Sequence, residues 1–353
     1  MNSHSVIDEY RQYLQRKRIL FTGMFLLLPF AFFLSITVGP VKIDSLEIVQ
    51  ILLGYEASET HTRIVYHFRL PQALAALLAG AGLAISGATM QAVLRNPLCS
   101  PFTLGISAAA VFGAALVIFL SEGALATSIP ASIVSQHFNS VTVGAFLSSA
   151  LATTLILTLS GKRSVKPETI ILIGVALGAF YGAGTMMLQY FATEWQLTAM
   201  VYWTFGDTQR ATWASVRIMS LCVAVSVVYF ISQSWNYNAL ALGEENAQSL
   251  GVHVRRMRLG TMFFASLLIS VLVASLGIIG FVGLVVPHGV RIGVGSDYRF
   301  VLPCSLVCGA LLLLLADTTA RSISPGCLMP VSILTAFLGA PLFFLMLLNR
   351  RDV

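Results

Sequence analysis

Long apolar stretches, separated by short polar connections, run along almost the whole chain. Ten of them are long and apolar enough to predict helices within a membrane, because a bilayer core needs about 20 mostly apolar residues per helix. The predicted spans are residues 19–38, 72–94, 102–121, 141–160, 169–192, 214–232, 259–280, 282–294, 301–319 and 330–348. The stretches are too continuous for a membrane β-barrel, whose strands alternate over about 10 residues. We therefore predict an all-α, polytopic membrane protein with about ten transmembrane helices.

The eighth span, residues 282–294, is shorter than the others. It follows the seventh span after a glycine-rich bend at Gly277, Gly280 and Gly283. This pattern is compatible with a half-length or re-entrant helix, and the sequence leaves open whether the span crosses the bilayer fully.

Composition and charge agree with a membrane protein and indicate its orientation. The chain has 353 residues, of which 57% are hydrophobic and 10% charged, whereas soluble domains carry about 25% charged residues. Its formal net charge is +6, and the basic residues cluster in connections on the N-terminal side. The opposite side holds only Lys42, Arg63, Arg69, Arg210, Arg217 and Arg321. Since basic residues mark the cytoplasmic side, we predict that both termini are cytoplasmic and that the charge does not indicate nucleic-acid binding.

The longest connection on the inner side, residues 233–258, contains a short charged segment. Glu244 and Glu245 stand where the first turn of a helix favours negative charge. Ala247 and Leu250 are three residues apart and are expected on one helix face, and Gly251 is a natural end of the helix. We predict a short amphipathic helix outside the membrane; a solvated loop anchored by positive charges is the alternative.

The spans contain little that could drive transport or catalysis. The ionisable residues that approach them, Arg217, His288, Arg291 and Asp317, all lie near predicted span ends, whereas an ion-coupled carrier needs an acid near the midplane. The segment "SGKRS" (160–164) lacks the upstream glycine of a phosphate-binding loop. We therefore predict no catalytic residue and no cofactor, and interpret the chain as a passive pore or a channel driven by a partner.

Two cysteines, Cys304 and Cys308, lie one helical turn apart in an apolar run. They could hold a metal, but no histidine or acid joins them, so we interpret them as small packing residues and predict no metal site.

The segment "LALGEENAQSLGV" (240–252) resembles the cytoplasmic coupling loop of FecCD-type permeases, which serve bacterial ABC importers for iron-siderophores, haem and vitamin B12. Further motifs of this family occur in the same order. They are "RLPQALAALLAGAGLAISGATMQAVLRNPLCSPFTLGIS" (69–107), "ILIGVALGAF" (171–180), "WTFGD" (203–207), "GFVGLVVPHGVR" (280–291), "LLLLLADTTAR" (311–321) and "PVSILTAFLGAPLFFLMLL" (330–348). The resemblance covers nearly the whole chain after about residue 40.

The resemblance implies a cobalamin-importer-permease-like bundle that forms one permease domain over residues 1–353. It implies a cytoplasmic tail at residues 1–18 and a coupling loop at about 233–258. It also implies a multi-pass protein of the bacterial inner membrane, paired with a second permease copy or a related permease. A cytoplasmic ABC ATPase dimer would hydrolyse ATP, so the chain itself is not expected to be an enzyme. A periplasmic or lipid-anchored binding protein would deliver the cargo.

The expected cargo is a metal chelate, with a ferric siderophore as first choice. Vitamin B12, haem or an oxyanion are alternatives from the same family. An ion-coupled secondary transporter and a haem- or quinone-binding redox subunit are alternatives of other classes. The lack of an acidic residue near the middle of any predicted span argues against the carrier, and the lack of paired histidines argues against the redox subunit.

The resemblance also implies roles for particular residues. The expected ATPase-coupling residues are Leu242, Gly243, Glu244, Ala247, Leu250 and Gly251. The expected docking residues for the binding protein are Arg69 and Arg321; the family often has another arginine where this chain has Gln72, and headgroup anchoring is the alternative role. The expected translocation pathway comprises Gly178, Tyr181, Gly182, Met186, Thr335 and Leu338, for which helix packing is the alternative role. The expected inner gate comprises Lys166, Pro167 and Glu168.

Overall fold

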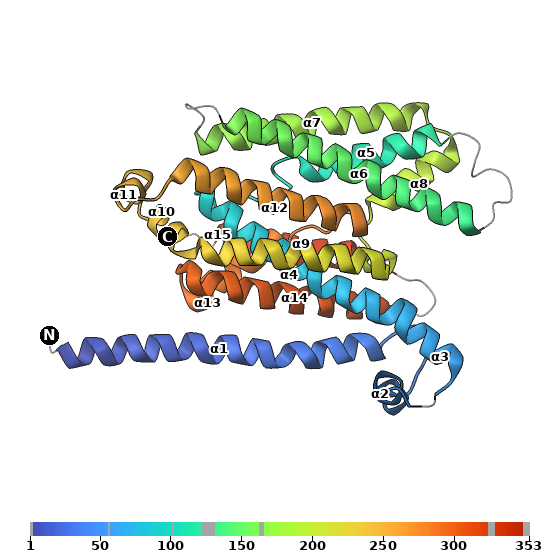
Figure 1. Ribbon diagram of the computed structural model, residues 1–353, viewed down its shortest axis with the longest axis horizontal. Helices are drawn as coiled ribbons and strands as arrows, with labels where there is room; N and C mark the ends of the chain where they lie inside the picture. Colours follow the sequence, from blue (N-terminus) through green and yellow to red (C-terminus); the bar gives the residue numbers. More distant parts are fainter. Residues whose placement is uncertain are drawn as a thin grey trace.

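The structure, a computed structural model, describes residues 3–55, 57–100, 102–121, 131–161, 166–323 and 329–348. Among these residues it is a bundle of helices (Figure 1). The long or apolar helices are α1 (Ser3–Thr37), α4 (Leu70–Val93), α5 (Ile106–Leu120), α6 (Ala131–Ser160), α7 (Pro167–Phe191), α9 (Trp213–Ser232), α12 (Val254–Leu276), α13 (Val282–Val294), α14 (Tyr298–Ile323) and α15 (Val331–Leu348). Each contains or overlaps one predicted span, so the prediction of an all-α membrane bundle is confirmed.

Length and composition divide these helices into two groups. Within the described residues, six helical stretches are long and apolar enough to cross a membrane, and four shorter apolar helices accompany them. The shorter group includes α13, whose 13 residues extend about 20 Å, less than the bilayer core of about 30 Å. The backbone between Gly277 and Phe281 covers further depth without being helical. It is tolerated there because protein surrounds it, as the isolated β-bridge between Ile278 and Phe205 shows.

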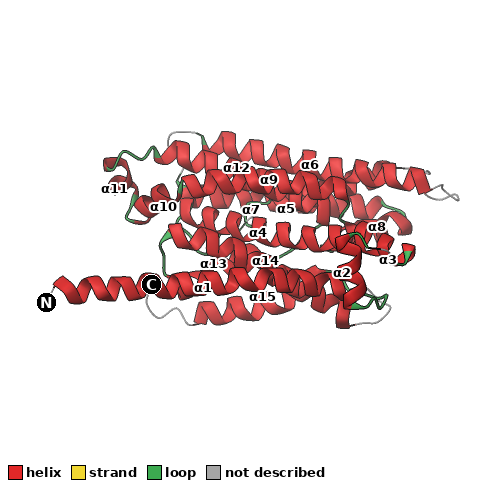
Figure 2. Cartoon of the chain, turned by 60° about the horizontal axis from the view of Figure 1, so that its bottom comes forward, coloured by secondary structure: helices red, strands yellow, loops and turns green. Residues whose placement is uncertain are grey.

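Short helices fill the connections, where the hydrophobic pattern predicted none except the charged inner one. At the end of the bundle that is predicted to face outward lie α2 (Ser45–Leu53), α3 (Glu59–Ile64), the π-helical turn η1 (Val65–Arg69), α8 (Glu194–Thr204) and the 3₁₀ turn η2 (Thr208–Arg210). At the end that is predicted to be cytoplasmic lie α10 (Ser234–Ala241) and α11 (Glu244–Ser249). Residues 3–18 of the predicted N-terminal tail are part of α1, which extends beyond the bundle (Figure 2).

Helix α4 is the centre of the bundle and packs against α9, α12, α13 and α14 (Figure 1). Small residues let these backbones approach closely. A Cβ atom added to Gly80 would lie 2.2 Å from the carbonyl oxygen of Gly309 in α14. A Cβ atom added to Gly87 would lie 1.8 Å from the carbonyl oxygen of Gly283 in α13. Glycine is therefore required at both crossings, and the small-residue motif 77–90 is explained by helix packing.

The substitution Gly80→Ala tests this packing, with Gly23→Ala in α1 as its matched control. The new methyl group at residue 80 would overlap the backbone of α14, and forcing the helices apart should cost about 3 kcal/mol or more. A Cβ atom at residue 23 meets nothing within 4 Å, so alanine there should be neutral or slightly stabilising. Thermal unfolding of the purified proteins in detergent measures the difference. Equal midpoints for the two variants would contradict the close crossing of α4 and α14.

Candidate functional site

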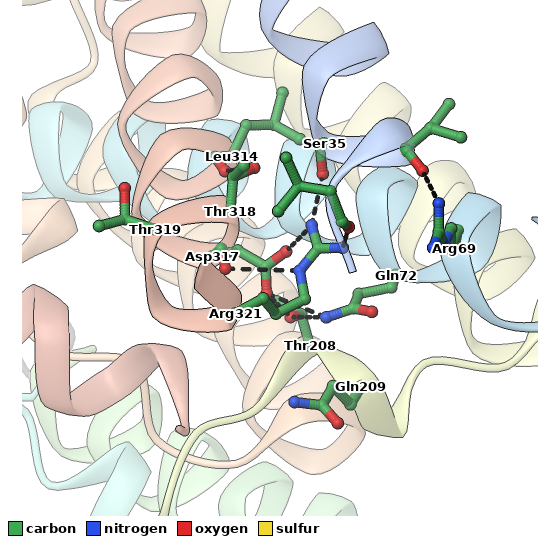
Figure 3. Close-up of polar contacts among 12 residues, drawn as sticks. Ser35, Arg69, Gln72, Thr208, Gln209, Leu314, Asp317, Thr318, Thr319 and Arg321 are labelled. Atoms are coloured by element: carbon green, nitrogen blue, oxygen red, sulfur yellow. Dashed lines mark hydrogen bonds and ion pairs between the residues drawn. The ribbon is translucent and has the colours of Figure 1, made fainter. Parts of the chain in front are cut away.

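Two polar regions stand out from the apolar bundle, one at each end. The inner region consists of α10, α11 and the first turns of α12, and we call it the inner surface. The outer region is a buried cluster of Ser35, Arg69, Gln72, Thr208, Asp317 and Arg321, and we call it the outer cluster (Figure 3). The inner surface contains the predicted coupling residues, and the outer cluster contains both predicted docking arginines.

Helix α11 forms as the sequence predicts. Its first turn holds Glu244 and Glu245. Gly243 and Gly251 flank it with φ angles of +116° and +84°, which glycine adopts without steric cost. The amide of Val252 bonds the carbonyl of Ala247 (3.0 Å) and closes the C-terminal end of the helix. Two glycines with positive φ thus fix a short helix outside the apolar bundle.

Glu244 has a second role that the sequence analysis missed. Its carboxylate pairs with Arg258 in α12, and the Nε of Arg258 donates to the carbonyl of Val93 at the end of α4 (3.1 Å). The side chain of Arg258 is largely buried, so the pair is worth more than an exposed one. It also places a carboxylate beside the N-terminal turns of α12, where a lone arginine is unfavourable. Arg258 therefore joins α11, α12 and the central helix α4.

The expectation that Ala247 and Leu250 share one face is wrong. Ala247 is fully buried, whereas Leu250 is 66% exposed. The reason is that α11 ends at Ser249, so Leu250 belongs to the turn that follows. Leu242, just before the helix, is 67% exposed. The two leucines on either side of α11 are the exposed apolar groups of this segment, and Ala247 anchors it from within.

Hydrogen bonds fasten α10 to the bundle. The Asn238 side chain donates to Asp297 (2.7 Å) and accepts from the amide of Tyr298 (2.8 Å). Burial alone would raise the pKa of Asp297, but hydrogen bonds from Arg299 and Asn238 outweigh it and lower the pKa to about 2. The Asp297 carboxylate is therefore ionised at neutral pH, and α10 is held against the start of α14.

At the opposite end, Asp317 is the acceptor at the centre of the outer cluster. It accepts from Arg321 one turn later in α14 (2.7 Å), from Gln72 of α4 (3.1 Å) and from the hydroxyl of Thr208. Figure 3 shows these side chains converging from three separate segments. Since a buried charge is costly unless it is paired and hydrogen-bonded, the cluster depends on all of these contacts.

Arg69 and Arg321 both bind the C-terminal end of α1. Arg69 donates to the carbonyls of Ile36 (2.8 Å) and Thr37 (3.0 Å), and Arg321 donates to the carbonyl of Val38 (2.7 Å). The last carbonyls of a helix have no partner within the helix, and that end carries partial negative charge. The two guanidinium groups satisfy both requirements and fix α1 to α4 and α14.

These contacts change the interpretation of the two arginines. A cation that docks a partner directly must be accessible, but Arg69 is 4% and Arg321 is 6% exposed. Gln72, at the position where the family often has an arginine, is also buried and donates to Asp317. The side chains of these residues are therefore not free at the surface of this chain, and the docking role of the two arginines stays a prediction. The i,i+4 spacing of Asp317 and Arg321 on a predicted helix was a signal of their ion pair.

The predicted pathway residues lie on two helices that pack in different parts of the chain. Helix α7 packs against α5, α6 and α8, whereas α15 packs against α13 and α14. Tyr181 is buried against Phe112 (5.6 Å between ring centroids), and Thr335 is buried too. Met186 and Leu338 are exposed, and Gly178 and Gly182 are half-buried. One chain alone does not bring the set together.

The predicted inner gate coincides with the start of α7. Lys166 precedes the helix, Pro167 is its first residue and Glu168 lies in its first turn. Proline and a carboxylate favour a helix start, so local structure explains these residue types. The preceding residues 162–165 lie outside the described residues.

The outer ion pair can be tested against a matched exposed pair. Asp317→Asn leaves Arg321 buried without a counter-charge and should cost about 3–5 kcal/mol. The double variant Asp317→Asn/Arg321→Gln should lose less than the sum of the single variants. Glu59→Gln breaks the exposed i,i+4 pair with Arg63 and should cost at most about 1 kcal/mol. A thermal-unfolding cycle in detergent checks this; strictly additive losses would mean that the two buried groups are not coupled.

Comparison with known proteins identifies a family for this chain, and the match includes both polar regions. The model of the FecCD transport family matches residues 27–349. A protein of Methanocaldococcus jannaschii, provisionally named as an ABC transporter permease, is 46% identical over 97% of both chains. The hemin transport system permease protein of Yersinia pestis is 37% identical over 81% of this chain and 83% of its own length. Other relatives are named for the import of vitamin B12, molybdate and Fe(3+)-citrate.

A solved structure agrees with these sequence relatives. It is provisionally described as a metal-chelate type ABC transporter in an inward-facing conformation. It superimposes with a TM-score of 0.80 and 30% sequence identity, and the match covers 94% of this chain and 99% of the other. Family model, relatives and fold thus agree over nearly the whole length, and the chain belongs to the FecCD transport family.

Proposed function

We propose that this chain is the permease subunit of an ABC importer that takes up a metal chelate. A separate ATPase dimer drives it from the cytoplasm, and a periplasmic or lipid-anchored binding protein delivers the cargo. The observation that carries the proposal is the inner surface, where Leu242 and Leu250 lie exposed on either side of a helix held by buried contacts. Exposed apolar side chains on a rigid support are suited to a partner protein.

We infer the orientation of the chain in the membrane from the direction of its first and last helices and from the distribution of basic residues. Helix α1 ends at the outer cluster, and α15 begins there, since Ser332 bonds Gly206 (3.1 Å). The start of the first described helix and the end of the last one therefore both lie toward the end of the bundle that holds α10 and α11. The basic residues predict that this end is cytoplasmic. We propose a multi-pass protein of the cytoplasmic membrane with both termini on the ATPase side.

We further propose that two copies form the transporter and that the cargo passes between them. The large apolar side chains on α7 and α15, including Phe180 and Phe337, are exposed in one chain. Pairing two chains would bring separate faces together around a passage. Gly178, Gly182, Met186 and Leu338 would line it, and Tyr181 and Thr335, which are buried within one chain, would support that lining from behind. Lys166, Pro167 and Glu168 would border its inner end. A homodimer is the simplest such pair; a related permease is the alternative.

A ferric siderophore remains the first choice of cargo, and vitamin B12, haem or an oxyanion are the alternatives. The binding protein selects the cargo in such a system. Co-purification of that protein with the chain from its source cells, followed by a ligand-binding screen, distinguishes these candidates. Uptake that needs a proton or sodium gradient and no ATPase would favour the secondary carrier.

The coupling role can be tested with Leu242→Ser/Leu250→Ser. Each leucine buried against the ATPase contributes about 1.5–3 kcal/mol, so the double variant should bind the ATPase at least about 100-fold more weakly. The exposed Gln248→Ala, in α11 itself, is the control and should bind normally. Co-purification of the ATPase and ATP hydrolysis stimulated by the binding protein are the measurements. Unchanged binding and hydrolysis in the double variant would remove α11 from the interface.

The docking role of Arg69 and Arg321 requires a test that separates a direct contact from support of the outer loops. Arg69→Gln should weaken association with the co-purified binding protein about tenfold at low salt. If the guanidinium pairs directly with the partner, the salt dependence of association should also become shallower. Arg63→Gln, at an exposed outer arginine, is the control. Association and salt dependence both unchanged in Arg69→Gln would exclude this arginine from docking.

A further inference from the structure

A basic pocket lies beside the inner surface, and none of the roles above uses it. It has a volume of about 750 Å³ and is formed by the inner ends of α4 and α13 together with α10. The polar groups that line it include Gln91, Arg95, His288, Arg291 and Tyr298. No aspartate or glutamate lines it among the described residues. Asp297 is next to Tyr298 in sequence, but its carboxylate already accepts hydrogen bonds from Asn238 and Arg299.

Arg291 lacks a counter-charge in the part of the chain that the structure describes. Its guanidinium donates to the neutral side chain of Gln91 and lies beside the neutral Tyr298, and it forms no ion pair with a described carboxylate. A guanidinium carries five N–H donors, and a partly buried charge is costly unless an opposite charge compensates it. The arrangement therefore leaves this arginine able to accept an anion.

Arg95 adds a second positive charge at the rim. It follows the end of α4 with a φ angle of +49°, a left-handed conformation that is uncommon for residues other than glycine and asparagine. Its side chain makes no ion pair with a described carboxylate. The ends of α4 and α13 contribute partial negative charge of about half a unit each, which the two full charges exceed. The pocket is thus net positive.

We propose that this pocket binds the phosphate group of an anionic phospholipid in the cytoplasmic leaflet. Arginine recognises phosphate through paired charge-assisted hydrogen bonds, and basic pockets between membrane helices on the cytoplasmic side suit anionic headgroups. Arg95 follows directly on the apolar helix α4, so this end of the helix is expected at the depth of the headgroups. Ile292, also at the pocket, is 75% exposed and provides apolar surface for an acyl chain. Free phosphate shares the same chemistry and is distinguished by the experiment.

The experiment compares lipid retention by the purified chain in native mass spectrometry. Detergent-solubilised protein is titrated with phosphatidylglycerol, with zwitterionic phosphatidylcholine, or with inorganic phosphate. Phosphatidylglycerol should be retained by the unmodified chain at about tenfold lower concentration than by Arg95→Gln, since one charge-assisted contact is lost. Arg256→Gln, at an exposed arginine in the first turn of α12, should behave like the unmodified chain.

Arg291→Gln should reduce the retention of phosphatidylglycerol further than Arg95→Gln does. If Arg291→Gln fails to fold, the comparison of Arg95→Gln with the unmodified chain decides the test. Retention of inorganic phosphate that depends on Arg95, without selectivity for phosphatidylglycerol over phosphatidylcholine, would support the site and identify free phosphate as its source. Equal phosphatidylglycerol retention in the unmodified chain and Arg95→Gln would overturn the proposal. An equal loss in Arg256→Gln would overturn it too, because the binding would then follow overall charge. None of these outcomes depends on transport, so they are independent of the proposed importer; the assignment to the cytoplasmic leaflet alone rests on the proposed orientation.

Discussion

The close contact of α4 with its neighbours is the constraint on which the rest of the structure depends. Lipid gives helices no hydrophobic reason to associate, so packing and hydrogen bonds must hold the bundle. At Gly80 and Gly87 the backbone of α4 touches the backbones of α14 and α13 with no room for a side chain. These crossings fix where both ends of α4 lie, and each end takes part in one polar region. The outer end provides Gln72, and the inner end provides the carbonyl of Val93 to Arg258.

The outer cluster shows how a buried charge can serve a helix that lies at the edge of the bundle. Helix α1 packs mainly against α14, and its C-terminal carbonyls would otherwise lack partners. Two arginines supply the donors, and one carboxylate, Asp317, compensates part of their charge. Arginine suits this position because its planar fork reaches several carbonyls at once. The cluster therefore joins the first helix, the central helix and α14 through the same few side chains.

The sequence predicted the long elements well because a single strong signal, apolar length, defines them. The glycine-rich approach to α13 was compatible with a half-length helix but left its length open, whereas the acidic start and the following glycine predicted α11. The outer helices α2, α3 and α8 were missed, because segments of 6–11 residues fall below the length that hydropathy can resolve. The environments of Arg69, Arg321 and Ala247 could not be predicted for a different reason. Burial and pairing there depend on residues far apart in the chain, such as Ile36 with Arg69.

Helices α7 and α15 pack in different parts of the chain, and this separation limits how a passage for cargo could form. A helix that lies against lipid and a helix that lines a passage can both expose apolar side chains, so exposure alone does not identify a pathway. Tyr181 and Thr335, however, turn into the chain's own interior, which leaves Met186 and Leu338 to contact whatever lies outside it. If a second copy covers these two positions, a passage between copies would be lined by weakly polar or apolar groups and by glycines. Such a surface offers a bulky chelate little to bind, so release would not be slowed by tight contacts within the membrane. The chemical selection of cargo would then belong to the delivering protein, and the permease would contribute the shape and the timing of the opening.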